Sequence, residues 1–265
     1  MRLKIKHVTR YQFDEPVVYG LQQLRKTPKT GHQQEVLYWS TTVDGGQKEL
    51  AFQDNHHNVV ELISIDRDAT LVTVTSEGEV EIEGNSGVVG PHPGPSPLWL
   101  YKRPTPLTKP GAGVRALARK AEGDTDIDRL HSLSAAIREA VTYEVGVSYP
   151  NWVAEQAISE GRGVCQDHTH IFLACARELG FPARYVSGYL MMNDRIDQEA
   201  THAWAEAHVD GLGWVGFDVS NGYSPDERYV RVATGLDYTE AAPVRGSRIG
   251  GANESLDVQI QVAQQ

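Results

Sequence analysis

Cys165 stands at the start of a segment that combines a nucleophilic side chain with the signals of a helix N-terminus. Gly163 precedes it by two positions, and an apolar-periodic run extends over residues 164–179. A cysteine in the first turn of a helix meets unpaired backbone N–H groups and the positive end of the helix dipole, and both favour the thiolate. The same N–H groups are candidate donors to an oxyanion. This segment therefore predicts a cysteine nucleophile.

A histidine and an aspartate follow in the order that a thiol nucleophile requires. His202 lies in an alternating run over residues 201–209, and Asp218 lies near the end of the next run, residues 213–219. If these runs form a hairpin with a loop of three or five residues, both side chains lie on one face of the sheet, whereas a loop of four would separate them. Asp218 would then orient the imidazole of His202, and His202 would exchange a proton with Cys165. The three residues together predict acyl transfer through a cysteine.

Other residues near this constellation are candidates for supporting it. Gln166 and Asp167 directly follow the nucleophile, and the Asp167 carboxylate can accept hydrogen bonds from nearby backbone. Aromatic side chains that could line a substrate cleft, although such residues more often pack in cores, are Tyr143, Trp152 and Trp204. Cys175 falls on the apolar face of the same predicted helix, so we expect it to be inert packing.

The sequence offers no metal site and no cofactor motif. On one helix, Cys165 and Cys175 would lie ~15 Å apart at ~1.5 Å per residue, so they cannot form a disulfide with each other. Residues 124–128 imitate the start of a calcium loop, but the glycine needed at loop position 6 is Arg129. We therefore expect no metal and no cofactor.

The bulk composition excludes several classes of partner. The 265 residues carry a net charge of −10 without any Lys- or Arg-rich run, which argues against nucleic acid or an anionic membrane as the main partner. No segment approaches the ~18 apolar residues of a membrane helix, and residues 1–6 alternate rather than forming the apolar stretch of a signal peptide. We expect a cytoplasmic protein whose partner is a peptide or protein amide substrate.

The elements that must position the three residues divide the chain into parts. Short alternating runs separated by turns occupy residues 1–89 and predict an antiparallel, β-sandwich-like leader domain. Residues 90–110 hold seven of the thirteen prolines and predict a semi-rigid linker. Residues 111–265 combine helical periodicity with alternating runs after residue 183, which predicts an α+β domain whose Cys-bearing helix packs on an antiparallel sheet.

Several short motifs occur together in this order in one known family. They are Gly163-Val164-Cys165-Gln166-Asp167, Phe181-Pro182-Ala183-Arg184-Tyr185-Val186-Ser187-Gly188-Tyr189, His202-Ala203-Trp204-Ala205-Glu206 and Gly213-Trp214-Val215-Gly216-Phe217-Asp218, together with Leu24-Arg25-Lys26-Thr27-Pro28 and residues 238–246. In these motifs the chain closely resembles the bacterial transglutaminase-like cysteine protease family. The resemblance implies a papain-like core in which Cys165, His202 and Asp218 are the nucleophile, the base and the orienting acid.

The chain departs from the family pattern at two places. Asp218-Val219-Ser220-Asn221 stands where the family usually has Asp-Pro-Thr-Asn, and the loss of the rigid proline predicts a looser loop. His57-Asn58 stands where the leader often has Gly-Asn. Neither departure changes the three predicted catalytic residues.

The sequence leaves several functions open for these residues. A thioester at Cys165 gives hydrolysis if water attacks it and transamidation if an amine does; the resemblance favours hydrolysis by a protease or amidase. A non-catalytic scaffold that binds peptides or a partner is the second interpretation, but a degenerate member would be expected to lack one of the three residues. The third is a thioester- or amide-handling enzyme of a peptide-synthesis pathway, with the same residues and a different acyl donor.

Overall fold

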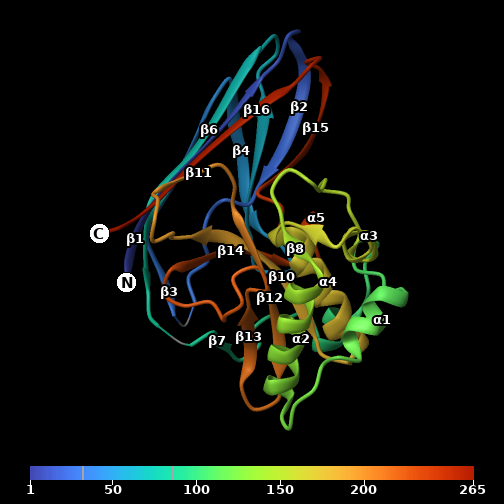
Figure 1. The fold of residues 1–265 in the computed structure, drawn as a ribbon. Coiled ribbons are helices and arrows are strands. Elements are labelled where there is room, and N and C mark those ends of the chain that lie inside the picture. Colours follow the sequence, from blue (N-terminus) through green and yellow to red (C-terminus); the bar gives the residue numbers. More distant parts are fainter. Residues whose placement is uncertain (32, 85) are drawn as a thin grey trace.

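The computed structural model describes residues 1–31, 33–84 and 86–265, and in this part of the chain strands form three larger antiparallel sheets and one parallel pair. Figure 1 shows the strands of the leader rising to one side and the helices grouped on the other, with the two termini next to each other. The predicted α+β class, with an N-terminal β-sandwich-like region and a papain-like core, is confirmed.

A five-stranded central sheet carries the residues of interest. Its strands, in spatial order, are β14 (Tyr229–Gly235), β10 (Ala183–Leu190), β12 (His202–Val209), β13 (Gly213–Phe217) and β7 (Val88–Gly90). The helices on one of its faces are α1 (Ala112–Ala118), α2 (Asp126–Ala140), α3 (Ala154–Glu160) and α4 (Cys165–Glu178). Small side chains on β12 (Ala203, Ala205 and Ala207) share a buried core with α4, which lets the helix lie close to the sheet. Gly180, with φ +91°, follows the end of α4 as predicted.

The leader is a sandwich of the two remaining larger sheets. One contains, in order, β11 (Asp197–Gln198), β16 (Ser255–Gln264), β1 (Arg2–Gln12), β6 (Leu71–Ile82) and β3 (Gln34–Asp44). The other contains β15 (Val244–Gly250), β2 (Val17–Leu24), β5 (Val59–Ile65) and β4 (Gly46–Gln53). The side chains packed in its core are Tyr11, Phe13, Val17, Leu24, Ile63, Ile65, Val72 and Val74. Alternation of apolar and polar residues along these strands produces this core, because every second side chain points inward.

The C-terminal strands do not stay with the central sheet. β16 pairs with β1 along its length, from Leu3 opposite Gln264 to Gln12 opposite Ser255, and β15 pairs with β2. The short strand β11, which lies between β10 and β12 in sequence, pairs with β16. Residues 244–264, which fall within the stretch 111–265, therefore complete the two sheets of the leader. β1 and β2 would otherwise each have an open edge, and the alternating pattern of a strand does not reveal its partner.

The proline-rich segment is packed against the rest of the molecule. Residues 90–110 contain a short 3₁₀ helix, η1 (Leu98–Lys102), whose Tyr101 is buried with its ring centroid 5.1 Å from that of Trp214. Arg177 in α4 donates from Nε to the backbone oxygen of Tyr101 at 3.0 Å. The predicted linker therefore forms part of the wall between the leader and the helices.

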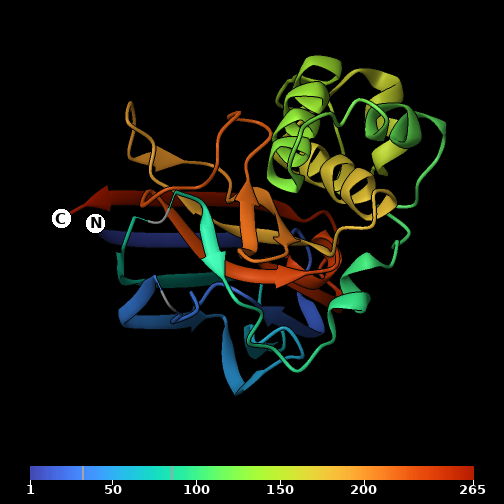
Figure 2. The same cartoon turned by 90° about the horizontal axis from the view of Figure 1, so that it is seen from below.

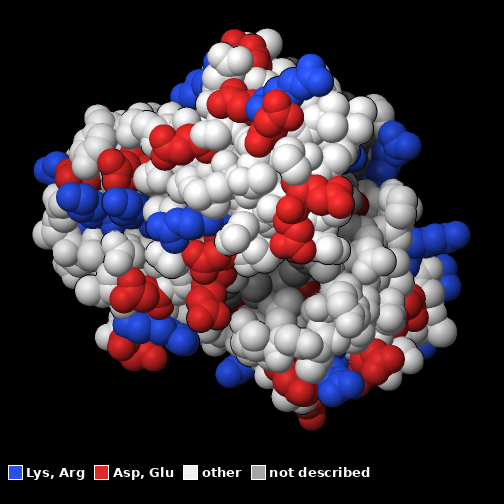
Figure 3. All heavy atoms as spheres, turned by 90° about the horizontal axis from the view of Figure 1, so that it is seen from above, with Lys and Arg blue, Asp and Glu red and all other residues white. Residues whose placement is uncertain are grey.

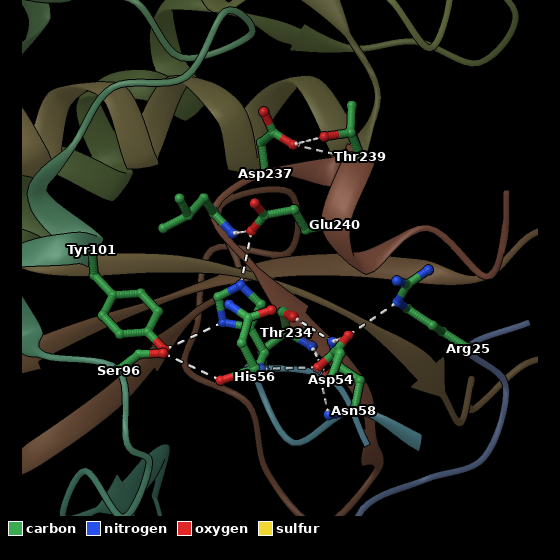
Figure 4. Close-up of polar contacts among 12 residues, drawn as sticks. Arg25, Asp54, His56, Asn58, Ser96, Tyr101, Thr234, Asp237, Thr239 and Glu240 are labelled. Atoms are coloured by element: carbon green, nitrogen blue, oxygen red, sulfur yellow. Dashed lines mark hydrogen bonds and ion pairs between the residues drawn. The ribbon is translucent and has the colours of Figure 1, made fainter. Parts of the chain in front are cut away.

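The leader docks on the face of the central sheet opposite the helices (Figure 2). The turn between β4 and β5 makes a pair of polar contacts with β14: Asn58 Nδ2 donates to the backbone oxygen of Thr234 at 2.8 Å, and the Thr234 N–H donates to Asn58 Oδ1 at 2.8 Å. Asp54 Oδ2 in turn accepts from Asn58 Nδ2 at 2.9 Å (Figure 4). Apolar packing also continues from the leader to the helices, because Leu3 in β1 belongs to the same buried cluster as Phe172 in α4.

Candidate active site

Cys165 is the first residue of α4 and is partly exposed. The parallel pair of β8 (Thr142–Tyr143) and β9 (Arg162–Gly163) leads the chain into this position. The carboxylate of Asp167 folds back and accepts the Val164 N–H at 2.8 Å, which fixes the turn before the nucleophile. A Cβ at position 163 would lie 2.8 Å from the Asp167 carboxylate, so the glycine allows this close approach.

Cys175 lies on the same helix in a different environment. It is fully buried, and its Sγ donates to the backbone oxygen of Val114 at 3.5 Å. Burial raises the pKa of the Cys175 thiol to about 12, so this thiol is protonated at neutral pH. Both cysteines are free, as the predicted spacing requires.

The hairpin of β12 and β13 has the register that places His202 and Asp218 together. Val209 pairs with Gly213, so the loop consists of residues 210–212, and three is one of the two lengths that put both side chains on one face. Ala205 pairs with Phe217, which puts Asp218 diagonal to His202 on one face. His202 Nε2 and Asp218 Oδ2 are 2.6 Å apart, and both residues are buried.

Asp218 is held as a carboxylate by donors from two directions. Its Oδ2 accepts the hydroxyl of Tyr229 at 2.6 Å and Nδ2 of Asn221 at 2.7 Å, and its Oδ1 accepts the Asn221 N–H at 3.2 Å. Burial raises the pKa of Asp218, but the hydrogen bond and charge of His202 and the bonds from Tyr229 and Asn221 outweigh it, so the pKa is lowered.

The same contacts favour the charged form of His202. Burial lowers its pKa, whereas the hydrogen bond and charge of Asp218, followed by those of Cys165, raise it to about 10. Because Asp218 engages Nε2, Nδ1 is the ring nitrogen left to face Cys165. The structure thus brings the three predicted residues together, with the imidazole of His202 between the Asp218 carboxylate and Cys165.

Trp204 supports the imidazole of His202. The two rings are nearly parallel, at 27°, with centroids 6.2 Å apart, and Tyr229 meets Trp204 edge-on at 5.3 Å. Trp204 lies across Gly188, where a Cβ would be 2.7 Å from the indole. The indole is therefore fixed between β10 and the histidine, and Trp204 acts as a buried support rather than as an open cleft wall.

The remaining predicted residues lie in three different settings. Tyr143 is half-exposed, and its pKa is raised by burial and then by the charge of Cys165, which places it beside the nucleophile. Gln166 donates from Nε2 to the backbone oxygen of Pro150 at 3.0 Å and so ties the loop before α3 to the helix. Trp152 belongs to the main buried core.

The loop after Asp218 is anchored although it lacks proline. Val219 is buried, and the Ser220 hydroxyl lies 2.9 Å from Nδ1 of His168 in α4. Nε2 of His168 bonds the backbone oxygen of Val141 at 2.9 Å, so the loop, α4 and the end of α2 are linked. No residue pattern in the sequence marks Tyr229 as part of the site. Asn221 had a local signal, because it stands three residues after Asp218.

Two family models match this chain. Residues 115–219 match the model of the transglutaminase-like superfamily, and residues 3–81 match that of the bacterial transglutaminase-like N-terminal region. An uncharacterized protein of Mycobacterium leprae is 27% identical over 280 residues, covering 98% of each chain. An uncharacterized protein of Mycobacterium tuberculosis is 26% identical over 290 residues, covering 98% of this chain and 92% of the relative.

A solved structure shares the fold over nearly the full length. It is that of a protein from Cytophaga hutchinsonii, provisionally named a cysteine protease, with a TM-score of 0.81 and 20% identity over 99% of this chain and 90% of that one. Within the described residues, no helix is both long and apolar enough to cross a membrane.

Proposed function

Because the chain belongs to the transglutaminase-like superfamily, we propose that it is a cysteine-dependent acyl-transfer enzyme that hydrolyses peptide or protein amides. The observation that carries the proposal is the run of contacts from Asp218 through His202 to Cys165 at the start of α4. A carboxylate that orients an imidazole beside a thiol is the arrangement that activates a cysteine nucleophile.

In the first half of the reaction, Sγ of Cys165 attacks the carbonyl carbon of the amide. The carbonyl π electrons move to oxygen, and N–H groups in the first turn of α4 are the nearest candidates to stabilise that oxyanion. When the tetrahedral intermediate collapses, the C–N bond breaks, and the leaving amine takes the proton that His202 holds. The product is a thioester on Cys165 with a neutral imidazole beside it.

In the second half, water attacks the thioester carbonyl carbon. His202 accepts a proton from that water, the C–S bond breaks, and the acid leaves while the thiolate–imidazolium pair is restored. The partial exposure of Cys165 favours water over an amine acceptor, because transamidation depends on keeping water away from the thioester. The same geometry does not support the scaffold interpretation, since Asp218 and His202 are both buried and fully engaged.

The experiment that tests the proposal follows the acyl group. The protein is incubated with a peptide library in H₂¹⁸O in the presence of a primary amine, and intact-protein and product masses are measured. We expect a mass adduct on Cys165 and ¹⁸O in the product carboxylate. Cys165→Ala should abolish both signals, whereas the matched control Cys175→Ala should retain them.

The other outcomes are equally specific. Incorporation of the amine in place of ¹⁸O would identify a transamidase and overturn the hydrolytic assignment. Peptide binding without any adduct in the unmodified protein would identify a scaffold and overturn the enzymatic one.

A further inference from the structure

A cavity of about 820 Å³ lies between the leader and the central sheet, outside the proposed active site. Its walls come from the start of β3 and the segment before it, from the turn between β4 and β5, from the proline-rich segment, and from β10 and β14. Its volume falls in the ordinary range for small-molecule sites, roughly 300–1,000 Å³. We call it the interdomain cavity.

The interdomain cavity is cationic in an acidic protein. Lys29, Arg184 and Arg231 line it, and among the described residues of its wall there is no Asp or Glu. The chain as a whole carries a net charge of −10, and Figure 3 shows acidic side chains gathered around a hollow on the face seen from above. Positive charge concentrated in a concave site within such a protein focuses a field that attracts anions.

The cations are fixed in place by neighbouring groups. Glu206, fully buried behind the wall, accepts Nε of Arg184 at 2.6 Å and Nε of Arg231 at 2.5 Å. Lys29 donates from Nζ to the backbone oxygen of His56 and to the Thr234 hydroxyl, both at 2.8 Å. One carboxylate therefore serves two guanidinium groups, and the ammonium group is held by neutral oxygens.

The three cations of the interdomain cavity repel one another. Burial lowers the pKa of Lys29, and the charges of Arg231 and Arg184 lower it further, against smaller opposing effects of Glu206 and Asp54. An anion beside Lys29 would neutralise this repulsion and accept charge-assisted hydrogen bonds.

The wall also contains a backbone conformation that suits glycine better than the residue present. His57 has φ +57°, in the left-handed region, and it is exposed at the interdomain cavity. The preceding residue, His56, is buried in a hydrogen-bonded frame with Tyr101 at 3.3 Å and Glu240 at 2.9 Å (Figure 4). The hydrogen bonds of His56 fix the conformation of the turn. His57 therefore keeps a left-handed backbone conformation that a glycine would adopt with less strain.

The interdomain cavity is separate from the nucleophile. The described residues that line it include none of Cys165, His202 and Asp218. A smaller hollow that shares Lys29 and Arg231 with the interdomain cavity extends to Trp204 and Tyr229.

We propose that the interdomain cavity is a binding site for a small anionic ligand that carries phosphate or carboxylate groups. Paired guanidinium groups and an ammonium group recognise both oxyanions by charge-assisted hydrogen bonds. The ligand is distinct from the amide substrate, because Cys165, His202 and Asp218 do not line the interdomain cavity.

The test measures binding rather than turnover, so it is independent of the proposed function. Inorganic phosphate and pyrophosphate form one arm, citrate forms the other, and sodium chloride at equal ionic strength is the reference. Isothermal titration calorimetry on the full chain gives the affinity, and the NMR resonances of the Arg184 and Arg231 Nε–H groups report the place of binding.

Three variants make the test specific. Lys29→Gln removes a cation from the wall but keeps a donor, and we expect binding to weaken at least tenfold. Asn55→Asp adds a negative charge at an exposed wall position without changing side-chain size, and we expect at least a threefold loss. Lys109→Gln removes an exposed lysine outside the interdomain cavity, and affinity should stay within twofold of the unmodified protein.

Each result decides the matter. Saturable binding of either arm that weakens in both wall variants supports the site, and the arm that binds identifies the phosphate or carboxylate class. Asn55→Asp keeps the test valid if Lys29→Gln fails to fold. The proposal is overturned if neither arm binds saturably, or if the wall variants and Lys109→Gln bind equally well.

Discussion

Replacing Asp218 with asparagine should move the alkaline limit of activity, because this carboxylate holds the proton on His202. The substitution keeps the size of the side chain but removes the charge 2.6 Å from Nε2. Burial would then act on His202 with only Cys165 to oppose it, and its pKa should fall well below about 10.

The expected loss of activity can be worked out from the pKa of His202. A rise of the His202 pKa from 6.5 to about 10 corresponds to roughly 5 kcal/mol at ~1.36 kcal/mol per pKa unit, shared between Asp218 and Cys165. Assigning about half or more to Asp218 predicts a loss of about 10²-fold in kcat/KM at neutral pH. The raised pKa means that the imidazolium is fully present below pH 6.5 and is lost as the pH rises through about 10.

The assay is kcat/KM for an activated peptide ester between pH 5 and 11. The unmodified protein should lose activity near pH 10, and Asp218→Asn should lose it at a clearly lower pH. Asp226→Asn is the matched control, because that carboxylate binds Arg228 rather than the imidazole. An alkaline limb that stays near pH 10 in Asp218→Asn, with a rate within about threefold of the unmodified protein, would refute the role given to Asp218.

Three further predictions address the nucleophile, the carboxylate and the buried ion cluster. Limiting iodoacetamide at neutral pH should label Cys165 almost exclusively, because burial keeps the Cys175 thiol protonated; equal labelling on peptide mapping would contradict this. Tyr229→Phe should lower kcat/KM by roughly tenfold with little change in melting temperature, since it removes one hydrogen bond to the Asp218 carboxylate and keeps the ring; an unchanged rate would remove the hydroxyl from the site. Glu206→Gln should lower the free energy of unfolding by about 3–5 kcal/mol at neutral pH, because two buried guanidinium groups lose their partner. Burial raises the pKa of Glu206 but its arginine partners lower it to about 2, so the stabilisation is present above pH 4.5 and the difference measured by denaturant titration should shrink as the pH falls towards 2.

The sequence by itself determined the parts of this protein that depend on neighbours in the chain. Gly163 before Cys165 and Gly180 after α4 marked both ends of the helix, because a close approach and a left-handed residue each favour glycine. Alternation and the turn residues predicted the hairpin that carries His202 and Asp218, whereas the loop of three residues, and with it the register, came from the structure. These features depend on residues that are close together in the sequence, so the residue types indicate them directly.

Tertiary structure alone decided which distant segments meet. Tyr229 reaches Asp218 only because β14 returns beside β10, and no local pattern marks that tyrosine as part of the site. β15 and β16 return to the leader because its open edges need partners, which alternation cannot specify. Lys29 and Thr234 are 205 positions apart, and the interdomain cavity exists only where the leader docks on the central sheet. A sequence pattern records which face of a strand is buried, whereas the surface that buries it depends on the packing of the whole chain.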